Sequence, residues 1–351
     1  QSYRTRLDSG DDGFVFGLYG TQTTRFLEKL IAALERARRT FLVPSGQAAL
    51  SLAMLAVLEP GNSVLISDSV YPPVRDFACN ELKKLGIRAI FYDPTDLTAL
   101  ESAMDETTRL VWVESPGSTT MEVQDVLAIV TLAHKQGALV GCDNTWATPF
   151  LFKPLEAGAD ISVQALSKYA NGHSDVLMGS ISVRDPGLAT KLRGTIWRLG
   201  IGVSPDDCAL VQRGLQTMSI RLAHSGAVAA RMATWIATQP MAARVLHPAL
   251  PGNPGHDIWA RDFKGASGVF SVALTDAALP KLDDALDSMR IFSIGASWGG
   301  TRSLIVPMNV SRHRSTPRAV GAETYLRISV GLESERELMD DVQGLFAKLQ
   351  T

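Results

Sequence analysis

Lys168 is the residue whose surroundings most clearly suggest chemistry. It lies in the run Ser167-Lys168-Tyr169-Ala170-Asn171-Gly172-His173-Ser174-Asp175, directly after the apolar stretch Ile161-Ser162-Val163-Gln164. An amine beside a hydroxyl group at this position can bind an aldehyde as a Schiff base and can also transfer protons. A solvated surface lysine is the ordinary alternative, because lysine is mostly exposed in folded proteins. Residues elsewhere in the chain favour the chemical interpretation.

Asp143 closes another apolar stretch, Leu139-Val140-Gly141-Cys142. A carboxylate at a buried strand end needs a cationic partner, because desolvation otherwise raises its pKa. A protonated pyridine nitrogen would be such a partner, and capping of the next segment is the alternative. Lys168 follows one strand-helix unit later, so the two side chains can lie on neighbouring strands at the same edge of one sheet.

Arg327 lies among apolar residues in the predicted strand Leu326-Arg327-Ile328-Ser329-Val330. A guanidinium group that points inward there is unfavourable unless its paired donors bind a carboxylate. The α-carboxylate of a substrate is the preferred ligand, and a buried Asp or Glu of the same chain is the alternative. The run Ser297-Trp298-Gly299-Gly300 adds a hydroxyl group and a bulky wall.

Gly46 and Gln47 begin an apolar helical stretch after Pro44-Ser45. The free N–H groups at such a helix start attract an anion, for instance a phosphate group, although the glycine could also serve only the local geometry. Tyr71 follows a buried strand and offers a flat face on which a planar ring could stack. A core tyrosine in a proline-rich turn is the alternative for Tyr71.

The hydrophobic pattern predicts the elements that position these residues. The ranges 63–67, 89–92, 110–113, 138–142 and 161–164 have the composition of strands buried on both faces, and they alternate with amphipathic stretches such as 26–35. This alternation predicts an α/β fold with a mostly parallel central sheet flanked by helices. Ligands bind at the carboxyl ends of such strands, where the candidate residues fall.

The pattern changes after Leu210. A long helical stretch over 211–239 and strands over 268–274 and 326–330 predict a smaller C-terminal α+β domain. We therefore expect an N-terminal arm over residues 1–20, a larger domain over 21–213 and a smaller domain over 214–351. The arm has the composition of a segment that lies on another surface.

The composition excludes several classes of protein. The 351-residue chain is 46% hydrophobic and carries a formal net charge of −2 without lysine or arginine blocks, so it lacks the charge footprint of a nucleic-acid-binding protein. We find no apolar run of membrane-spanning length and no signal-peptide core. Cys79, Cys142 and Cys208 are widely spaced and no histidine pair has metal-ligand spacing, which argues against a disulfide framework and a metal site. A cytoplasmic location fits best.

Taken together, the motifs resemble the Cys/Met-metabolism family of pyridoxal-phosphate (PLP) enzymes. The likeness runs from about Phe16 to the end, and five motifs occur in the family's order: Glu114-Ser115-Pro116-Gly117-Ser118, Asp143-Asn144-Thr145-Trp146, the Lys168 segment, Ser297-Trp298-Gly299-Gly300 and Arg327. The resemblance implies the type I aminotransferase-like fold, with PLP as cofactor and an amino acid as substrate.

The resemblance also implies a role for each candidate residue. Lys168 would form the Schiff base and transfer protons, with Tyr71 stacking on the ring near the reacting carbon. Asp143, with Thr145 beside it, would bind the pyridine nitrogen. The phosphate would be bound by Gly46, Gln47 and Ser167. The substrate carboxylate would be bound by Ser297 and Arg327, with Trp298 also lining the substrate site.

Within the family, Ser118-Thr119-Thr120-Met121-Glu122-Val123 resembles the β-lyase branch, because γ-acting members tend to carry asparagine where this chain has Ser118. The implied reaction is β-elimination of cystathionine to homocysteine, pyruvate and ammonia. A γ-lyase or γ-synthase of the same family stays open, as does a catalytically weakened relative with a binding or regulatory role. A nicotinamide-dependent dehydrogenase is disfavoured, because no GxGxxG follows the first strand.

The chain departs from the family pattern in the arm and in the substrate pocket. Phe16 and Leu18 stand where the family usually has tyrosine and arginine that reach the phosphate of the neighbouring subunit. Ala296 stands where the β-lyase branch often has tyrosine, which enlarges the pocket. The chain also begins later than family members, so an N-terminal segment is expected to precede it. The family relation implies a homotetramer of dimers with shared active sites.

Overall fold

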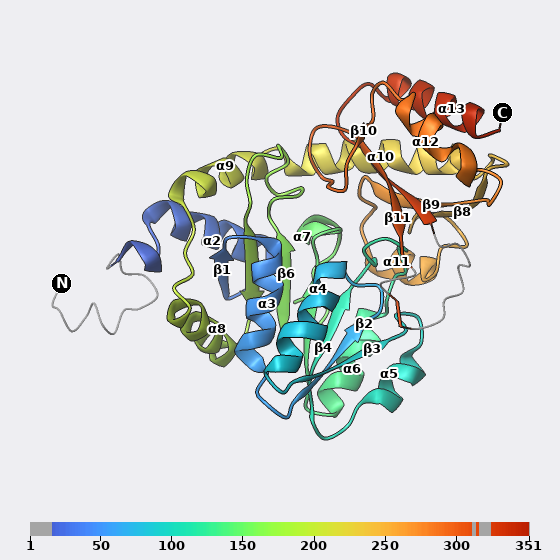
Figure 1. Ribbon diagram of the computed structural model, residues 1–351. Coiled ribbons are helices and arrows are strands. Elements are labelled where there is room, and N and C mark those ends of the chain that lie inside the picture. The colour runs from blue at the N-terminus through green and yellow to red at the C-terminus, as the bar shows by residue number, and fades with distance from the viewer. Residues whose placement is uncertain (1–15, 311–313, 316–323, 351) are drawn as a thin grey trace.

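The computed structural model describes residues 16–310, 314–315 and 324–350, and Figure 1 shows its two sheets. The larger sheet has seven strands in the order β1-β7-β6-β5-β4-β2-β3. Strand β7 is antiparallel to both of its neighbours, and the other pairs are parallel. The strands are β1 (Arg39–Val43), β2 (Ser63–Ser67), β3 (Arg88–Tyr92), β4 (Thr108–Glu114), β5 (Leu139–Asp143), β6 (Ile161–Ala165) and β7 (Gly179–Val183).

Helices cover both faces of this sheet, as the sequence predicts. Along β4, Leu110 and Trp112 pack into one core cluster with α3 and α4, whereas Val111 and Val113 pack into another with α2 and α6. Strand β3 differs from the prediction, because it lies at the sheet edge and is only partly buried. The helical elements on the large sheet are η1 (Gly17–Tyr19), α2 (Gln22–Glu35), α3 (Gly46–Val57), α4 (Pro72–Phe77), η2 (Ala78–Leu82), α5 (Leu97–Ala103), α6 (Val126–Lys135), α7 (Thr148–Leu151) and α8 (Pro186–Arg198).

The prediction of one long helix over 211–239 is wrong. The structure has α9 (Pro205–Leu215) and α10 (Met218–Ile236), and Gln216 and Thr217 lie between them. The carbonyl oxygen of Gly214 accepts hydrogen bonds from the Thr217 hydroxyl and from Arg221 Nη2. These bonds stabilise the turn of the chain at the end of α9. Strands β1 and β7 were not predicted from the sequence, although each is as long as β2, β5 and β6.

The smaller sheet has the order β10-β11-β12-β9-β8 and packs against α10, which is yellow in Figure 1. We propose the break between α9 and α10 as the boundary between the two units. No helix among the described residues is long and apolar enough to cross a membrane. The remaining elements are β8 (Ala242–Leu246), α11 (His256–Asp262), β9 (Val269–Leu274), η3 (Leu279–Lys281), α12 (Leu282–Asp287), β10 (Ser293–Ile294), β11 (Leu304–Asn309), β12 (Thr324–Ser329) and α13 (Glu335–Gln350).

Candidate active site

Lys168 lies three residues beyond the carboxyl end of β6, in a turn that the Lys168 N–H closes on the Ala165 carbonyl. Its Nζ atom donates a 2.8 Å hydrogen bond to Ser297 Oγ and lies 5.2 Å from the centroid of the Trp298 ring. The pKa of the amine is lowered from 10.5 to about 8, mainly by burial and also by Arg327, while Asp143 opposes the shift. A larger fraction of this amine is therefore neutral near pH 7 than of an ordinary lysine.

Asp143 is the last residue of β5 and lies beside β6, so its side chain and Lys168 occupy neighbouring strand ends, as predicted. Within the described residues, the hydrogen bonds that it accepts end on Oδ1, from the Thr145 N–H at 2.9 Å and the Thr145 hydroxyl at 2.5 Å. Burial raises the pKa of Asp143, and the Thr145 hydrogen bonds and Lys168 oppose this rise. Oδ2 is thus left for a cationic ligand.

Arg327 is buried in β12, as predicted, and its Nη2 atom donates to the Ala296 carbonyl. This bond ties the guanidinium group to the loop that carries Ser297 and Trp298. Burial lowers the pKa of Arg327, whereas Tyr71 and Glu114 raise it. Among the described residues Arg327 forms no ion pair, so the intrachain carboxylate considered above is not its direct partner.

The start of α3 approaches the Lys168 turn closely. A Cβ atom on Gly46 would lie only 2.5 Å from the Cβ of Ala165, so glycine is required for this approach. Ser45 caps the helix, because its Oγ accepts the Ala48 N–H and its carbonyl accepts the Ala49 N–H. The N–H groups of Gly46 and Gln47 have no intrahelical partner at these positions and are available to an anion.

The side chain of Gln47 does not point toward the Lys168 turn, because its Nε2 atom donates to the Pro73 carbonyl at 3.2 Å and to Ser51 Oγ. Only the backbone of Gln47 is therefore available for the predicted phosphate contact. Ser167 lies between Lys168 and the end of β6, and its N–H donates to the Met178 carbonyl. Ser167 is partly buried.

Tyr71 caps α4, and its side chain is 43% exposed, so the ring is not part of the core. Its N–H donates to Glu114 Oε2 at 2.6 Å. Glu114 ends β4 and stands in register with Asp143, so it belongs to the same strand-end cluster. Glu114 begins the motif Glu114-Ser115-Pro116-Gly117-Ser118, and the sequence alone assigned it no role. Its position as a charged residue that closes an apolar strand is the signal that could have identified it.

His173 does not join this cluster. Its Nδ1 atom lies 2.7 Å from the Asn171 carbonyl oxygen, so the ring makes a local contact beside the turn. The described part of the arm begins at Phe16; residues 1–15, which make up most of the predicted arm, lie outside the described residues. Phe16 is 61% exposed and contacts Tyr19, whose ring packs on Trp197 at 4.3 Å.

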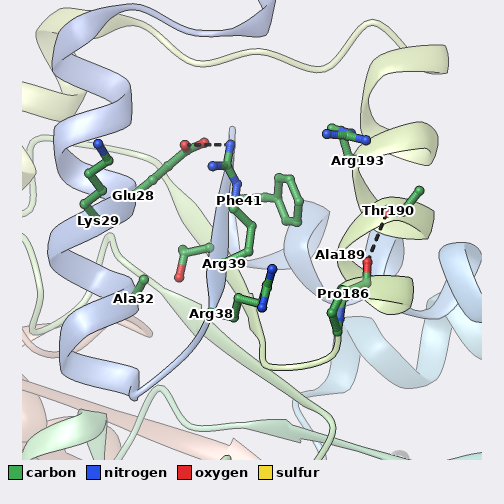
Figure 2. Close-up of a pocket in the computed structure, with 11 residues that line it drawn as sticks. Glu28, Lys29, Ala32, Arg38, Arg39, Phe41, Pro186, Ala189, Thr190 and Arg193 are labelled. Carbon is green, nitrogen blue, oxygen red and sulfur yellow. Dashed lines mark hydrogen bonds and ion pairs between the residues drawn. The ribbon is translucent and has the colours of Figure 1, made fainter. Parts of the chain in front are cut away.

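A separate cavity of about 330 Å³ lies between α2, β1 and α8 and is drawn in Figure 2. It is lined by the basic residues Lys29, Arg38, Arg39 and Arg193, and by Glu28, which pairs with Arg39 at 3.5 Å. It shares no residue with the Lys168 cluster. No group of three or more His, Cys, Asp or Glu residues in the described part of the chain has the arrangement of a metal site.

The model of the family described as "Cys/Met metabolism PLP-dependent enzyme" matches residues 2–347. The chain belongs to this family. It is 38% identical over 341 residues to a cystathionine beta-lyase of Escherichia coli strain K12, which covers 95% of this chain and 86% of that protein. It is also 39% identical over 333 residues to an L-alanine/L-glutamate racemase of Wolbachia pipientis wMel, with 94% and 82% covered.

Solved structures agree with the fold. A crystal structure of cystathionine gamma-lyase from Lactobacillus plantarum, complexed with L-serine, superposes with a TM-score of 0.90. The match covers 97% of this chain and 90% of that chain at 28% identity. The fold is therefore the type I aminotransferase-like fold that the motifs implied, and the enzyme is PLP-dependent.

The residues present fit this cofactor. The N–H groups at the start of α3 suit its phosphate, and the free Oδ2 of Asp143 suits its pyridinium nitrogen. The partly buried Lys168 amine lies between these two groups along the sheet edge. These features come from three different strand ends, which the parallel sheet brings together.

Proposed function

We propose that the chain is a PLP-dependent carbon–sulfur lyase that cleaves cystathionine by β-elimination. The observation that carries the proposal is the Lys168–Ser297 hydrogen bond of 2.8 Å, in a loop that Arg327 also contacts. A proton-transferring amine and a carboxylate-binding guanidinium group thus flank one position. An α-amino acid held there by its carboxylate would present its Cα to the amine.

The cofactor-binding residues are proposed from the same geometry. Lys168 would hold PLP through its amine, Asp143 with Thr145 would bind the pyridine nitrogen, and the Tyr71 ring would stack on the cofactor ring. Gly46, Gln47 and Ser167 would bind the phosphate. When bound, PLP supplies an electron sink conjugated to the substrate Cα.

Arg327 binds the substrate carboxylate through the guanidinium donors that Ala296 does not occupy, and Ser297 assists. Trp298 forms a wall of this pocket. The Lys168 amine would remove the Cα proton, because its lowered pKa of about 8 makes it a competent base near neutral pH. The Cβ–S bond then breaks with its electron pair on sulfur, and the thiolate takes up a proton as homocysteine.

In the overall reaction, cystathionine and water give homocysteine, pyruvate and ammonia. Support for β rather than γ cleavage comes from Ser118, which stands at the position where γ-acting members tend to carry asparagine, and from the 38% identity to a cystathionine beta-lyase. A product assay tests this choice. Purified protein given PLP and cystathionine should release pyruvate; release of 2-oxobutyrate would instead assign γ-elimination.

Two further outcomes would also overturn the proposal. Conversion of L-alanine to D-alanine without release of pyruvate from cystathionine would assign a racemase, the activity in the name of the relative with 39% identity. Turnover no faster than that of free PLP, in a folded protein, would assign a binding or regulatory role.

Lys168→Ala provides the residue-level test. The variant should lose the visible absorbance of the bound cofactor and at least about 10³-fold of the activity, because it lacks both the attachment and the proton-transferring group. Lys191→Ala is the matched control, since Lys191 is exposed on α8. Retention of both signals in Lys168→Ala would contradict the assignment.

We further propose a cytoplasmic homotetramer built from dimers that share their active sites. Several large apolar side chains are exposed on the single chain and would be covered by assembly: Phe16, Leu177, Leu199 and Ile220. The three cysteines are free, which suits a reducing compartment. Sedimentation equilibrium, with and without PLP, measures the molar mass of the assembly and therefore the number of subunits.

A further inference from the structure

We propose that Glu114 is a positioning residue that fixes Tyr71 in the place from which it stacks on the cofactor. The inference rests on the proposed role of Tyr71. Its starting observation is the 2.6 Å hydrogen bond from the Tyr71 N–H to Glu114 Oε2, which joins residues far apart in the sequence. No role for Glu114 follows from the motifs alone.

The local sequence makes this bond the anchor of the Tyr71 loop. Pro72 and Pro73 follow Tyr71 and have no N–H group, and the Val74 N–H is used within the turn, by the Tyr71 carbonyl at 2.9 Å. The Tyr71 N–H is therefore the last backbone donor of the loop that can reach another element. Tyr71 is 43% exposed, so packing within the chain covers it only in part, and the anchored backbone contributes to the direction of its ring.

A second bond ties the same two loops together. The Ser118 N–H donates to the Ser69 carbonyl at 2.9 Å, and the Ser118 side chain lies near enough to Glu114 to oppose the rise in the pKa of its carboxyl group. A Cβ atom on Gly117 would lie 2.6 Å from the Cβ of Ser69, so glycine permits the close approach. The loop that carries Tyr71 and the loop that follows β4 thus form one unit, with the Glu114 carboxyl group at its centre.

Glu114 also connects Tyr71 to the residues at the other parts of the site. It pairs in register with Asp143 across β4 and β5, so the two side chains lie on the same face of neighbouring strand ends. Arg327 lies within electrostatic reach of Glu114 and of Tyr71. The ring-stacking residue, the pyridine-binding residue and the carboxylate-binding residue therefore share one neighbour.

The chemistry of this position favours an acceptor rather than a charge. Burial and the neighbouring Asp143 raise the pKa of Glu114 well above its ordinary value. A neutral carboxyl group still accepts the Tyr71 N–H through one oxygen. Glutamine has the same side-chain length as glutamate and also has an acceptor oxygen. Aspartate keeps the carboxyl group, but its side chain is one methylene group shorter, so its oxygens lie farther from the Tyr71 N–H.

The experiment compares Glu114→Gln, Glu114→Asp and Glu114→Ala by the dissociation constant of PLP and by visible circular dichroism of the bound cofactor. Glu114→Gln should stay within about 3-fold of the parent in affinity, with the same dichroic band. Glu114→Asp and Glu114→Ala should bind PLP about 10-fold more weakly, with a reduced band. Equal defects in all three variants, or none in any, would overturn the proposal.

A double-mutant cycle with Tyr71→Ala separates positioning from a general structural effect. If Glu114 acts through Tyr71, Glu114→Ala should add less than 2-fold to the loss in PLP affinity that Tyr71→Ala causes alone. Fully additive losses would overturn the proposal. These binding measurements use no substrate, so failure of the β-elimination assay leaves them unaffected, and the two proposals can fail separately.

Discussion

The Nζ atom of Lys168 and the Oγ atom of Ser297 lie 2.8 Å apart, although Lys168 follows strand β6 of the larger sheet and Ser297 precedes strand β11 of the smaller sheet. The hydrogen bond therefore joins the two halves of the chain at the site. The length of this hydrogen bond depends on how the two sheets are placed relative to each other, so the position of the Lys168 amine depends on both sheets. A change at Ser297 should act on Lys168 without disturbing either core.

Ser297→Ala should lower kcat for the lyase reaction by about 2- to 13-fold, which corresponds to the loss of one hydrogen bond of about 0.5–1.5 kcal/mol. Steady-state kinetics with cystathionine measure the effect. Ser293→Ala is the control, because Ser293 is also exposed near β11 but does not contact Lys168. Equal kinetics for Ser297→Ala and the parent would show that the bond does not orient the amine during catalysis.

Arg327→Lys should raise the KM for cystathionine and lower kcat/KM by about 10- to 150-fold. Lysine keeps the charge but loses the paired donors that match a carboxylate, and a hydrogen bond to a charged group contributes about 1.5–3 kcal/mol. Arg336→Lys on the exposed face of α13 is the control. A variant with unchanged KM would assign the substrate carboxylate to another residue.

Much of the larger sheet could be predicted from the sequence, because its inner strands are buried on both faces and are therefore continuous apolar runs. Strands such as β2 coincide with their predicted range, whereas β7 begins at Gly179. A Cβ atom there would lie 2.3 Å from the Ser45 carbonyl, so the residue is dictated by a contact with a distant segment. Such contacts leave no periodic signal in the sequence.

In the candidate site, too, the residues that depend on contacts between distant segments could not be predicted from the sequence. Asp143, Lys168 and Arg327 could be proposed because a charged residue inside or at the end of an apolar strand is unusual. Glu114 met the same condition and was overlooked, because its partner is the Tyr71 backbone rather than a side chain. The side-chain direction of Gln47 could not be predicted either, since it depends on how α3 packs near Pro73.

Cofactor uptake by the cofactor-free protein should depend on pH through Lys168. The neutral amine attacks the aldehyde, so the association rate should rise with pH and level off above about 8, where most of the amine is unprotonated. Stopped-flow absorbance at several pH values measures the rate. A midpoint near 10.5, the ordinary value for lysine, would contradict the lowered pKa.

Arg327→Gln gives this experiment its internal check. Arg327 lowers the pKa of the Lys168 amine, so removal of its positive charge should move the midpoint to higher pH. Asp143 raises the same pKa, so Asp143→Asn should move the midpoint in the opposite direction. Shifts of the same sign in both variants would show that another group controls the rate.

Stability should depend on pH through Glu35, a fully buried carboxyl group on α2. Its Oε1 atom accepts from Ser162 and Gln164, and Oε2 has no partner among the described residues. Burial raises its pKa from 4.5 to about 7, so the folded state binds the proton more tightly than the unfolded state. The stabilisation is complete below about pH 4.5 and is lost as the pH rises through about 7.

Glu35→Gln removes this titration. The difference in unfolding free energy between pH 5 and pH 8 should shrink in the variant by up to about 2.5 kcal/mol, the part of the full effect of this pKa shift that falls between these two pH values. Thermal and denaturant unfolding at both pH values, with PLP concentration held constant, measure the change. Glu101→Gln, at an exposed position on α5, is the control and should keep the pH dependence of the parent. If Glu35→Gln keeps it too, another buried group governs the loss of stability above neutral pH.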